Sequence, residues 1–361
     1  MLHRESTANV RGLVSRQSIS RRHFMGLGAG MVFAPAVAAS LFAIPGSAAA
    51  TSDIQSQVSS AAANLLFAEQ GVYGVVMMKT DGTVLFKQNA DLPFIAASLY
   101  KLIVMVDFYA SRDRGDITFD QTIVLQPEYF HAPDEDVDVF YDDTMVGAEV
   151  TISELLFAMI AYSSNVAAHA LLSMTSPGDL NAVAADLGMS STYLLMPLSD
   201  VEPWPPRSLI ADAPGESESA LRFVGEYGKD GDINLTTPAD IATFFMMLEE
   251  GNIVSADTSQ EMVDLLKQQE INDRLPFLLP AGTACAHKTG DLDGVVHDAG
   301  VVFGDQGPII VAALSEAVPD RDRAAGVIQR LGLIAYGDYN LPPIPDATPE
   351  ATPGTSVPSG G

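Results

Sequence analysis

The stretch GTACAHKTGDLDGVVHDAGVVFGDQGPIIVAALSE, residues 282–316, contains three strand-like apolar runs joined by short turns. Strands joined in this way pair antiparallel. An earlier segment, GVYGVVMMKTDGTVLFKQN at residues 71–89, has two apolar runs around Asp81-Gly82, a strong hairpin signal. Together these five runs predict one five-stranded antiparallel sheet.

Helical patterns flank and interrupt this sheet. We expect an amphipathic helix at residues 53–70 and a closing helix at residues 322–337. A long helical middle separates the hairpin from the late strands, and Thr151 with Glu154 forms a capping-box pattern there. The order predicts an α+β fold, in which N- and C-terminal helices flank the sheet and an all-helical domain is inserted. The sheet subdomain is expected at 51–95 and 275–340, and the helical subdomain at 96–274.

Residues 1–50 have the character of an export signal, with five arginines against one acidic residue. An apolar run at 26–44 and small residues at 48–50 follow the arginines, so we expect cleavage near Thr51. A run of this length is close to the ~20 residues of a membrane-spanning helix, and a retained anchor is the alternative. The core of the segment resembles twin-arginine signals through Ser20, Arg21, Arg22 and Phe24. We therefore predict export to the periplasm or cell exterior, without stable membrane association after cleavage.

The overall composition restricts the classes of function. The formal net charge is −27, which repels phosphate backbones and argues against a nucleic-acid partner. The single cysteine, Cys285, rules out an internal disulfide and is expected to be a buried, inert thiol. The histidines show no metal-ligand spacing, so no metal or cofactor is implied. Residues 341–361 are rich in Pro, Thr and Ser and are expected to be disordered.

One lysine stands out within the apolar stretch IAASLYKLIVMVDFY, residues 95–109. Burying the Lys101 ammonium is costly unless it is paired or loses its proton. Ser98 lies three residues earlier, so both side chains are expected on one face at a helix start. Burial and nearby cations would lower the pKa of Lys101, making an amine that accepts the Ser98 proton.

Two further motifs accompany this pair. Ser163-Ser164-Asn165 lies between two predicted helices, and Lys288-Thr289-Gly290 lies in the first late strand. In this order, the three motifs resemble the active-site set of serine β-lactamases and penicillin-binding proteins. The resemblance is closest to class A β-lactamases and covers roughly residues 55–335. It implies a β-lactamase/transpeptidase-like fold, and a small-molecule β-lactam or a D-Ala-terminated peptide as substrate.

The resemblance assigns the catalytic roles. It implies that Ser98 is acylated with Lys101 as its base, that Ser163 passes a proton to the leaving nitrogen, and that Asn165 holds the substrate amide. Each motif alone has a plainer explanation, because serines before Asn165 could simply cap a helix.

The late strand supplies the predicted substrate clamp. By resemblance, Lys288 provides positive potential and supports the proton-donating serine, and Thr289 binds a substrate carboxylate. Thr289-Gly290 alone could be an ordinary strand end. The oxyanion hole would use the backbone N–H groups of Ser98 and Asp291.

The sequence departs from the class A pattern in the deacylating loop. Glu202-Pro203 resembles the Glu-Pro pair of that family, but Trp204, Pro205 and Pro206 stand where Glu, Leu and Asn are usual. Glu202 is therefore the candidate deacylating base, and a solvated loop carboxylate is the alternative.

Two more departures concern the clamp. A carboxylate at Asp291 would repel a substrate carboxylate at Thr289, unless it is protonated or paired with a lysine. Many class A enzymes have an arginine after the following strand turn, where this chain has His297. A buried histidine with satisfied hydrogen bonds is expected there.

Three functions fit these residues. The first is an exported class A-type serine hydrolase that destroys β-lactam antibiotics and so confers resistance. The second acylates in the same way but deacylates slowly, as a D-alanyl-D-alanine peptidase of the cell wall does. The third is a β-lactamase-like binding module without turnover, which would have no need of a buried lysine beside a serine.

Overall fold

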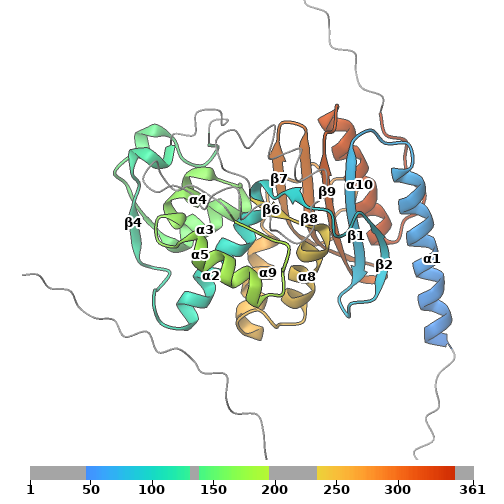
Figure 1. The fold of residues 1–361 in the computed structure, drawn as a ribbon, viewed down its shortest axis with the longest axis horizontal. Coiled ribbons are helices and arrows are strands. Elements are labelled where there is room, and N and C mark those ends of the chain that lie inside the picture. The colour runs from blue at the N-terminus through green and yellow to red at the C-terminus, as the bar shows by residue number, and fades with distance from the viewer. Residues whose placement is uncertain (1–45, 131–137, 195–233, 346–361) are drawn as a thin grey trace, which may run out of the picture. The chain divides into compact units, whose positions relative to one another are not determined.

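The computed structural model describes residues 46–130, 138–194 and 234–345 of the chain (Figure 1). Most of the predicted export signal, Glu202 and the tail beyond residue 345 lie outside these ranges, so those assignments stay predictions. Within the described ranges, no helix combines the length and the apolar character needed to cross a bilayer.

The sheet has five strands in the order β2-β1-β9-β8-β7, and every neighbouring pair is antiparallel. This confirms the predicted sheet. The hairpin turns where predicted, because Gly82 adopts a φ of +84° and the Asp81 carboxylate accepts a bond from the Thr83 N–H at 2.9 Å. The strands are β1 (Val72–Lys79), β2 (Val84–Gln88), β7 (Cys285–Leu292), β8 (Val295–Gly304) and β9 (Gly307–Glu316).

Helices cover both faces of the sheet. Helices α1 (Gly46–Leu66) and α10 (Arg321–Tyr336) contact one face, and α8 (Pro238–Glu249) contacts the other (Figure 1). Along β1, Val75 and Met77 belong to the apolar cluster on the face that α1 and α10 cover. Val76 and Met78 belong to the apolar cluster on the face that α8 covers. A sheet covered on both sides favours continuous apolar strands, which is why these runs do not alternate.

The inserted region consists mainly of short helices that share a core with the sheet. The apolar cluster that includes Val76 of β1 continues through Met159 and Leu171. Two short strand pairs, which the sequence does not predict, tie the insertion together, since strands of two or three residues have no readable period. The elements are β3 (Phe94–Ile95), α2 (Lys101–Asp113), β4 (Thr122–Val124), β5 (Glu149–Thr151), α3 (Ile152–Ala161), α4 (Asn165–Leu172), α5 (Pro177–Asp186), β6 (Leu235–Thr236) and α9 (Ala256–Leu266).

Several local predictions can be compared with the structure. The capping box at α3 is confirmed, because the Thr151 hydroxyl accepts from the Glu154 N–H at 3.2 Å and Glu154 accepts from the Thr151 N–H at 3.0 Å. Cys285 is buried as expected, and burial raises the pKa of its thiol. Helix α1 begins seven residues earlier than predicted, because the alanines at 48–50 favour helix.

Candidate active site

Ser98 lies in a 3-10 turn, η1 (Ala97–Tyr100), that runs directly into α2. The Lys101 N–H donates to the Ser98 carbonyl and so joins the turn to the helix. Ala97 has a φ of +43°, an uncommon conformation for a residue other than glycine. Ser98 is partly exposed, whereas the Lys101 side chain is 0% exposed. Ser98 is therefore the accessible residue of the pair, and the Lys101 amine is enclosed by the protein.

The Lys101 amine reaches the Ser163-Ser164-Asn165 turn. It donates to the Asn165 side-chain oxygen at 2.6 Å and to the Ser163 carbonyl at 2.6 Å. The Ser163 hydroxyl lies 3.3 Å away. These bonds explain how the ammonium is tolerated among apolar neighbours. The direct contact with the Ser98 hydroxyl, and the lowered pKa expected for Lys101, stay predictions.

The two serines of this turn make different contacts. Ser164 is the N-cap of α4, since its hydroxyl accepts from the Ala167 N–H at 3.0 Å. Ser163 has a φ of +57° and directs its hydroxyl towards the lysines instead. The helix-cap explanation thus holds for Ser164, and Ser163 remains available for chemistry.

Asp138 supports this turn from a distant loop, and sequence reasoning missed it. Its carboxylate accepts from the Ser164 hydroxyl at 2.6 Å and from the Val166 N–H at 3.1 Å. A carboxylate at the first turn of α4 is favourable. No sequence signal separates Asp138 from the other acidic residues of its segment, because only tertiary structure brings it to α4.

Lys288 approaches Ser163 from the opposite side, on β7. Its amine donates to the Ser163 hydroxyl at 2.9 Å and to the Thr289 carbonyl at 3.0 Å. Complete burial, and next the charge of Lys101, hold the pKa of Lys288 well below its usual range. The Ser163 hydroxyl therefore lies between two buried amines, of which one loses its proton readily. That arrangement can deliver a proton to a nearby atom and be reprotonated.

β7 passes close to the Ser98 turn. A Cβ at Gly290 would lie 3.2 Å from the Ala97 Cβ, so glycine permits this approach. Thr289 is 1% exposed, and its predicted contact with a substrate carboxylate stays a prediction. The Asp291 carboxylate is paired with Arg274 at 2.5 Å, so its partner is an arginine and not the lysine considered from the sequence.

His297 is buried with both ring nitrogens bonded, as expected. Its Nε2 donates to the Ile95 carbonyl at 2.7 Å, and its Nδ1 accepts from the Ser315 N–H at 3.1 Å. Burial lowers the pKa of His297 to about 4. The ring is neutral at neutral pH and does not replace the cation of an arginine.

Glu202 lies outside the described residues, so its relation to Ser98 stays a prediction. Across residues 46–130, 138–194 and 234–345, no group of three His, Cys, Asp or Glu side chains could hold a metal ion.

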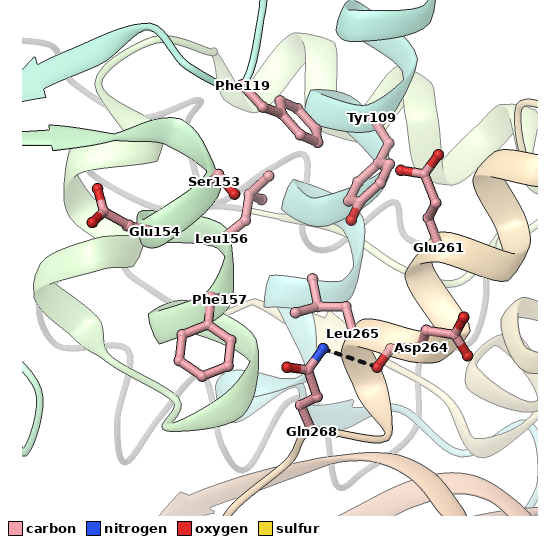
Figure 2. A pocket seen from close by; sticks show the side chains of 10 residues that line it. All are labelled: Tyr109, Phe119, Ser153, Glu154, Leu156, Phe157, Glu261, Asp264, Leu265 and Gln268. Atoms are coloured by element: carbon pink, nitrogen blue, oxygen red, sulfur yellow. Dashed lines mark hydrogen bonds between the residues drawn. The ribbon is translucent and has the colours of Figure 1, made fainter.

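A separate hollow of about 530 Å³ lies between α2, α3 and α9 (Figure 2). Arg112 pairs with Glu261 at this hollow and lies over the Tyr109 and Phe119 rings. Of the predicted site residues that the structure describes, none lines it. The lining residues are Tyr109, Phe119, Ser153, Glu154, Leu156, Phe157, Glu261, Asp264, Leu265 and Gln268.

Comparisons with known proteins bear on the family and the fold of the chain. The family described as "Beta-lactamase enzyme family" matches residues 57–339. No curated protein sequence matches the chain.

Solved structures show the same fold. A β-lactamase from Sphaerobacter thermophilus is 29% identical, with a TM-score of 0.61 over 78% of this chain and 97% of that one. A class A β-lactamase of the last common ancestor of Gram-negative bacteria is 26% identical, with a TM-score of 0.60 over 78% of this chain and 97% of that one. PBP-A, 23% identical with a TM-score of 0.61, is similar in fold over 79% of this chain and 94% of that one.

Proposed function

Because the chain belongs to the β-lactamase enzyme family, we propose that it is an exported serine hydrolase that opens β-lactam amides through an acyl-enzyme on Ser98. The observation that carries the proposal is the Ser163 hydroxyl, which lies 2.9 Å from the amine of Lys288 and 3.3 Å from that of Lys101. Both amines are buried, whereas Ser98 is partly exposed.

Acylation proceeds by attack of the Ser98 oxygen on the amide carbonyl carbon. Lys101 accepts the hydroxyl proton in its neutral amine form, and the backbone N–H groups of Ser98 and Asp291 stabilise the oxyanion. The C–N bond then breaks, and Ser163 gives its proton to the leaving nitrogen. Lys101 or Lys288 reprotonates Ser163, which their bonds to this hydroxyl support. Asn165 orients the substrate amide.

Deacylation needs a water molecule and a base. Glu202 takes a proton from water, and the water oxygen bonds to the ester carbon. The bond from that carbon to the Ser98 oxygen then breaks, and the proton held by Glu202 returns to the Ser98 oxygen. The Glu202-Pro203 pair supports this role through its resemblance to class A enzymes.

A second candidate is a penicillin-binding acyl transferase acting on D-Ala-terminated peptides. Residues 204–206, which depart from the class A sequence directly after the Glu-Pro pair, favour it because the deacylating machinery would be altered. The fold likeness to PBP-A agrees with either function.

Hydrolysis of a chromogenic cephalosporin tests the proposal. The wild-type protein should turn over the substrate, and Ser98→Ala should abolish turnover. Stoichiometric acylation without turnover would instead favour the acyl transferase. No reaction at all would leave only a binding module and overturn the proposal.

The Glu202→Ala variant tests the second step separately. It should react once and accumulate the acyl-enzyme, which is seen as a burst equal to the enzyme concentration. Unchanged steady-state hydrolysis would remove Glu202 from the mechanism.

A further inference from the structure

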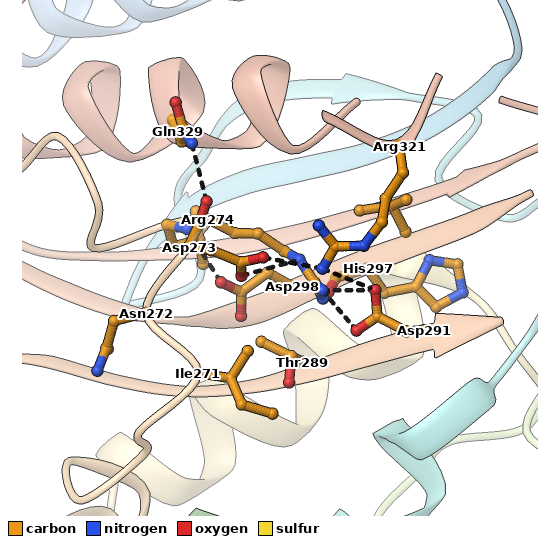
Figure 3. Close-up of polar contacts among 12 residues, drawn as sticks. Ile271, Asn272, Asp273, Arg274, Thr289, Asp291, His297, Asp298, Arg321 and Gln329 are labelled. Carbon is orange, nitrogen blue, oxygen red and sulfur yellow. Dashed lines mark hydrogen bonds and ion pairs between the residues drawn. The ribbon is translucent and has the colours of Figure 1, made fainter. Parts of the chain in front are cut away.

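A closed ion-pair cluster lies at the end of β7, next to the proposed oxyanion site (Figure 3). The Arg274 side chain is 0% exposed, and other groups of the protein bond to both of its terminal nitrogens. One terminal nitrogen contacts both Asp291 oxygens at 2.5 Å, and the other donates to the His297 carbonyl at 2.6 Å. The Arg274 Nε lies 3.3 Å from a carboxylate oxygen of Asp273.

Arg321 closes the cluster from α10. It pairs with Asp273 at 2.8 Å and with Asp291 at 3.3 Å. Two guanidinium groups therefore face the Asp273 and Asp291 carboxylates, and a third carboxylate, Asp322, lies 3.7 Å from Arg321. The Asp291 and Arg321 side chains are 40% and 50% exposed, so the cluster reaches solvent through them. An approaching ligand meets the Asp291 carboxylate before it meets the buried Arg274.

The β7 backbone directly before Asp291 lies beside the Ser98 turn. Gly290 packs against Ala97, and these residues directly precede Asp291 and Ser98 in the chain. The resemblance to class A enzymes assigns a substrate carboxylate to Thr289, two residues before Asp291, so the proposed reaction would bring that carboxylate to this part of β7. Such a carboxylate would need the cations that Asp291 already holds. Thr289, the other predicted carboxylate ligand, is 1% exposed.

We propose that Asp291 is a specificity-determining residue that acts against substrates carrying a carboxylate beside the scissile amide. The site favours substrates whose leaving group is neutral there, such as an ester or an amide. This inference rests on the proposed function and names its substrate class. Asp291 disfavours such substrates, because its carboxylate already binds the Arg274 guanidinium. A substrate carboxylate would either displace Asp291 from Arg274 or be repelled by it.

The experiment compares a penicillin with its methyl ester, which differs only in this carboxylate. The value of kcat/KM, or of the acylation rate if deacylation is slow, is measured for both compounds with the wild type and with Asp291→Asn. The variant should gain about tenfold or more on the acid, mainly through KM, and should change little on the ester. The ratio of variant to wild type is compared between the acid and the ester, which removes the intrinsic reactivity of each compound.

Two further variants make the result decisive. Arg321→Gln, at a half-exposed position, removes one cation and leaves Asp291 in place, so reaction with the acid should fall while reaction with the ester holds. This keeps the test valid if Asp291→Asn folds poorly. Asp305→Asn, at the hairpin on the opposite end of β8, changes the net charge by the same amount as Asp291→Asn. It should not change the reaction of the acid relative to that of the ester.

The outcomes separate the inference from the proposed function. If Asp291→Asn changes acid and ester equally, or if Arg321→Gln leaves the acid unaffected, then Asp291 does not set specificity, although the hydrolase proposal stands. If neither compound acylates Ser98 in any variant, the proposed function fails, and the inference fails with it.

Discussion

The Ser163 hydroxyl contacts the amines of both lysines of the site. Ser163→Ala should lower the acylation rate by about 10²–10⁴-fold, the usual contribution of a positioned proton donor. Pre-steady-state acylation by a chromogenic cephalosporin measures this loss. Ser173→Ala is the matched control, because its hydroxyl donates to the Ala170 carbonyl of α4 at 2.7 Å. Equal rates for Ser163→Ala and the wild type would exclude Ser163 as the proton donor.

Asp138 should act on the same turn without contacting substrate. Asp138→Asn weakens its bonds to the Ser164 hydroxyl and the Val166 N–H, and we expect about 1–3 kcal/mol of lost stability. A shifted Ser163 should also lower kcat by up to about 10²-fold with little change in KM, measured far below the melting temperature. Asp142→Asn, an N-cap carboxylate in the same acidic segment, should leave kcat unchanged. A kcat that does not respond to Asp138→Asn would make its role purely structural.

At the scale of elements, His297 ties β8 to β3 and β9. Its pKa is about 4 in the folded protein against 6.5 ordinarily, so the folded state favours the neutral ring. The unfolded chain binds more protons between these values, and stability therefore falls as the pH drops from 6.5 to 4, by up to about 3 kcal/mol from this group. Urea unfolding across this range should show a flatter pH dependence for His297→Gln. Identical slopes would contradict the assignment.

Elements with local signals could be predicted from the sequence. The hairpin at Asp81-Gly82, the capping box at Thr151 and the three late strands follow from neighbouring residues, and all appear in the structure. The motif lysines and Ser163 were identified for the same reason, because each motif is contiguous. Arg274 and Asp138 were missed because their partners lie 17 and 26 residues away and meet only after folding.

At the scale of the whole molecule, the charge of −27 sets a long-range field. An anionic substrate is repelled during approach, and salt screens this repulsion. We expect kcat/KM for a penicillin to rise a few-fold when NaCl increases from about 20 mM to about 300 mM, whereas the methyl ester should respond little. If kcat/KM for the penicillin fell as NaCl increased, attraction by cations near the site would outweigh the repulsion from the net charge.

The identity of the acylated residue tests the central claim most directly. The protein is incubated with a penicillin, digested, and mapped by mass spectrometry. We expect one penicilloyl adduct on the peptide that contains Ser98, and none in Ser98→Ala. An adduct on another residue, or turnover retained by Ser98→Ala, would contradict it.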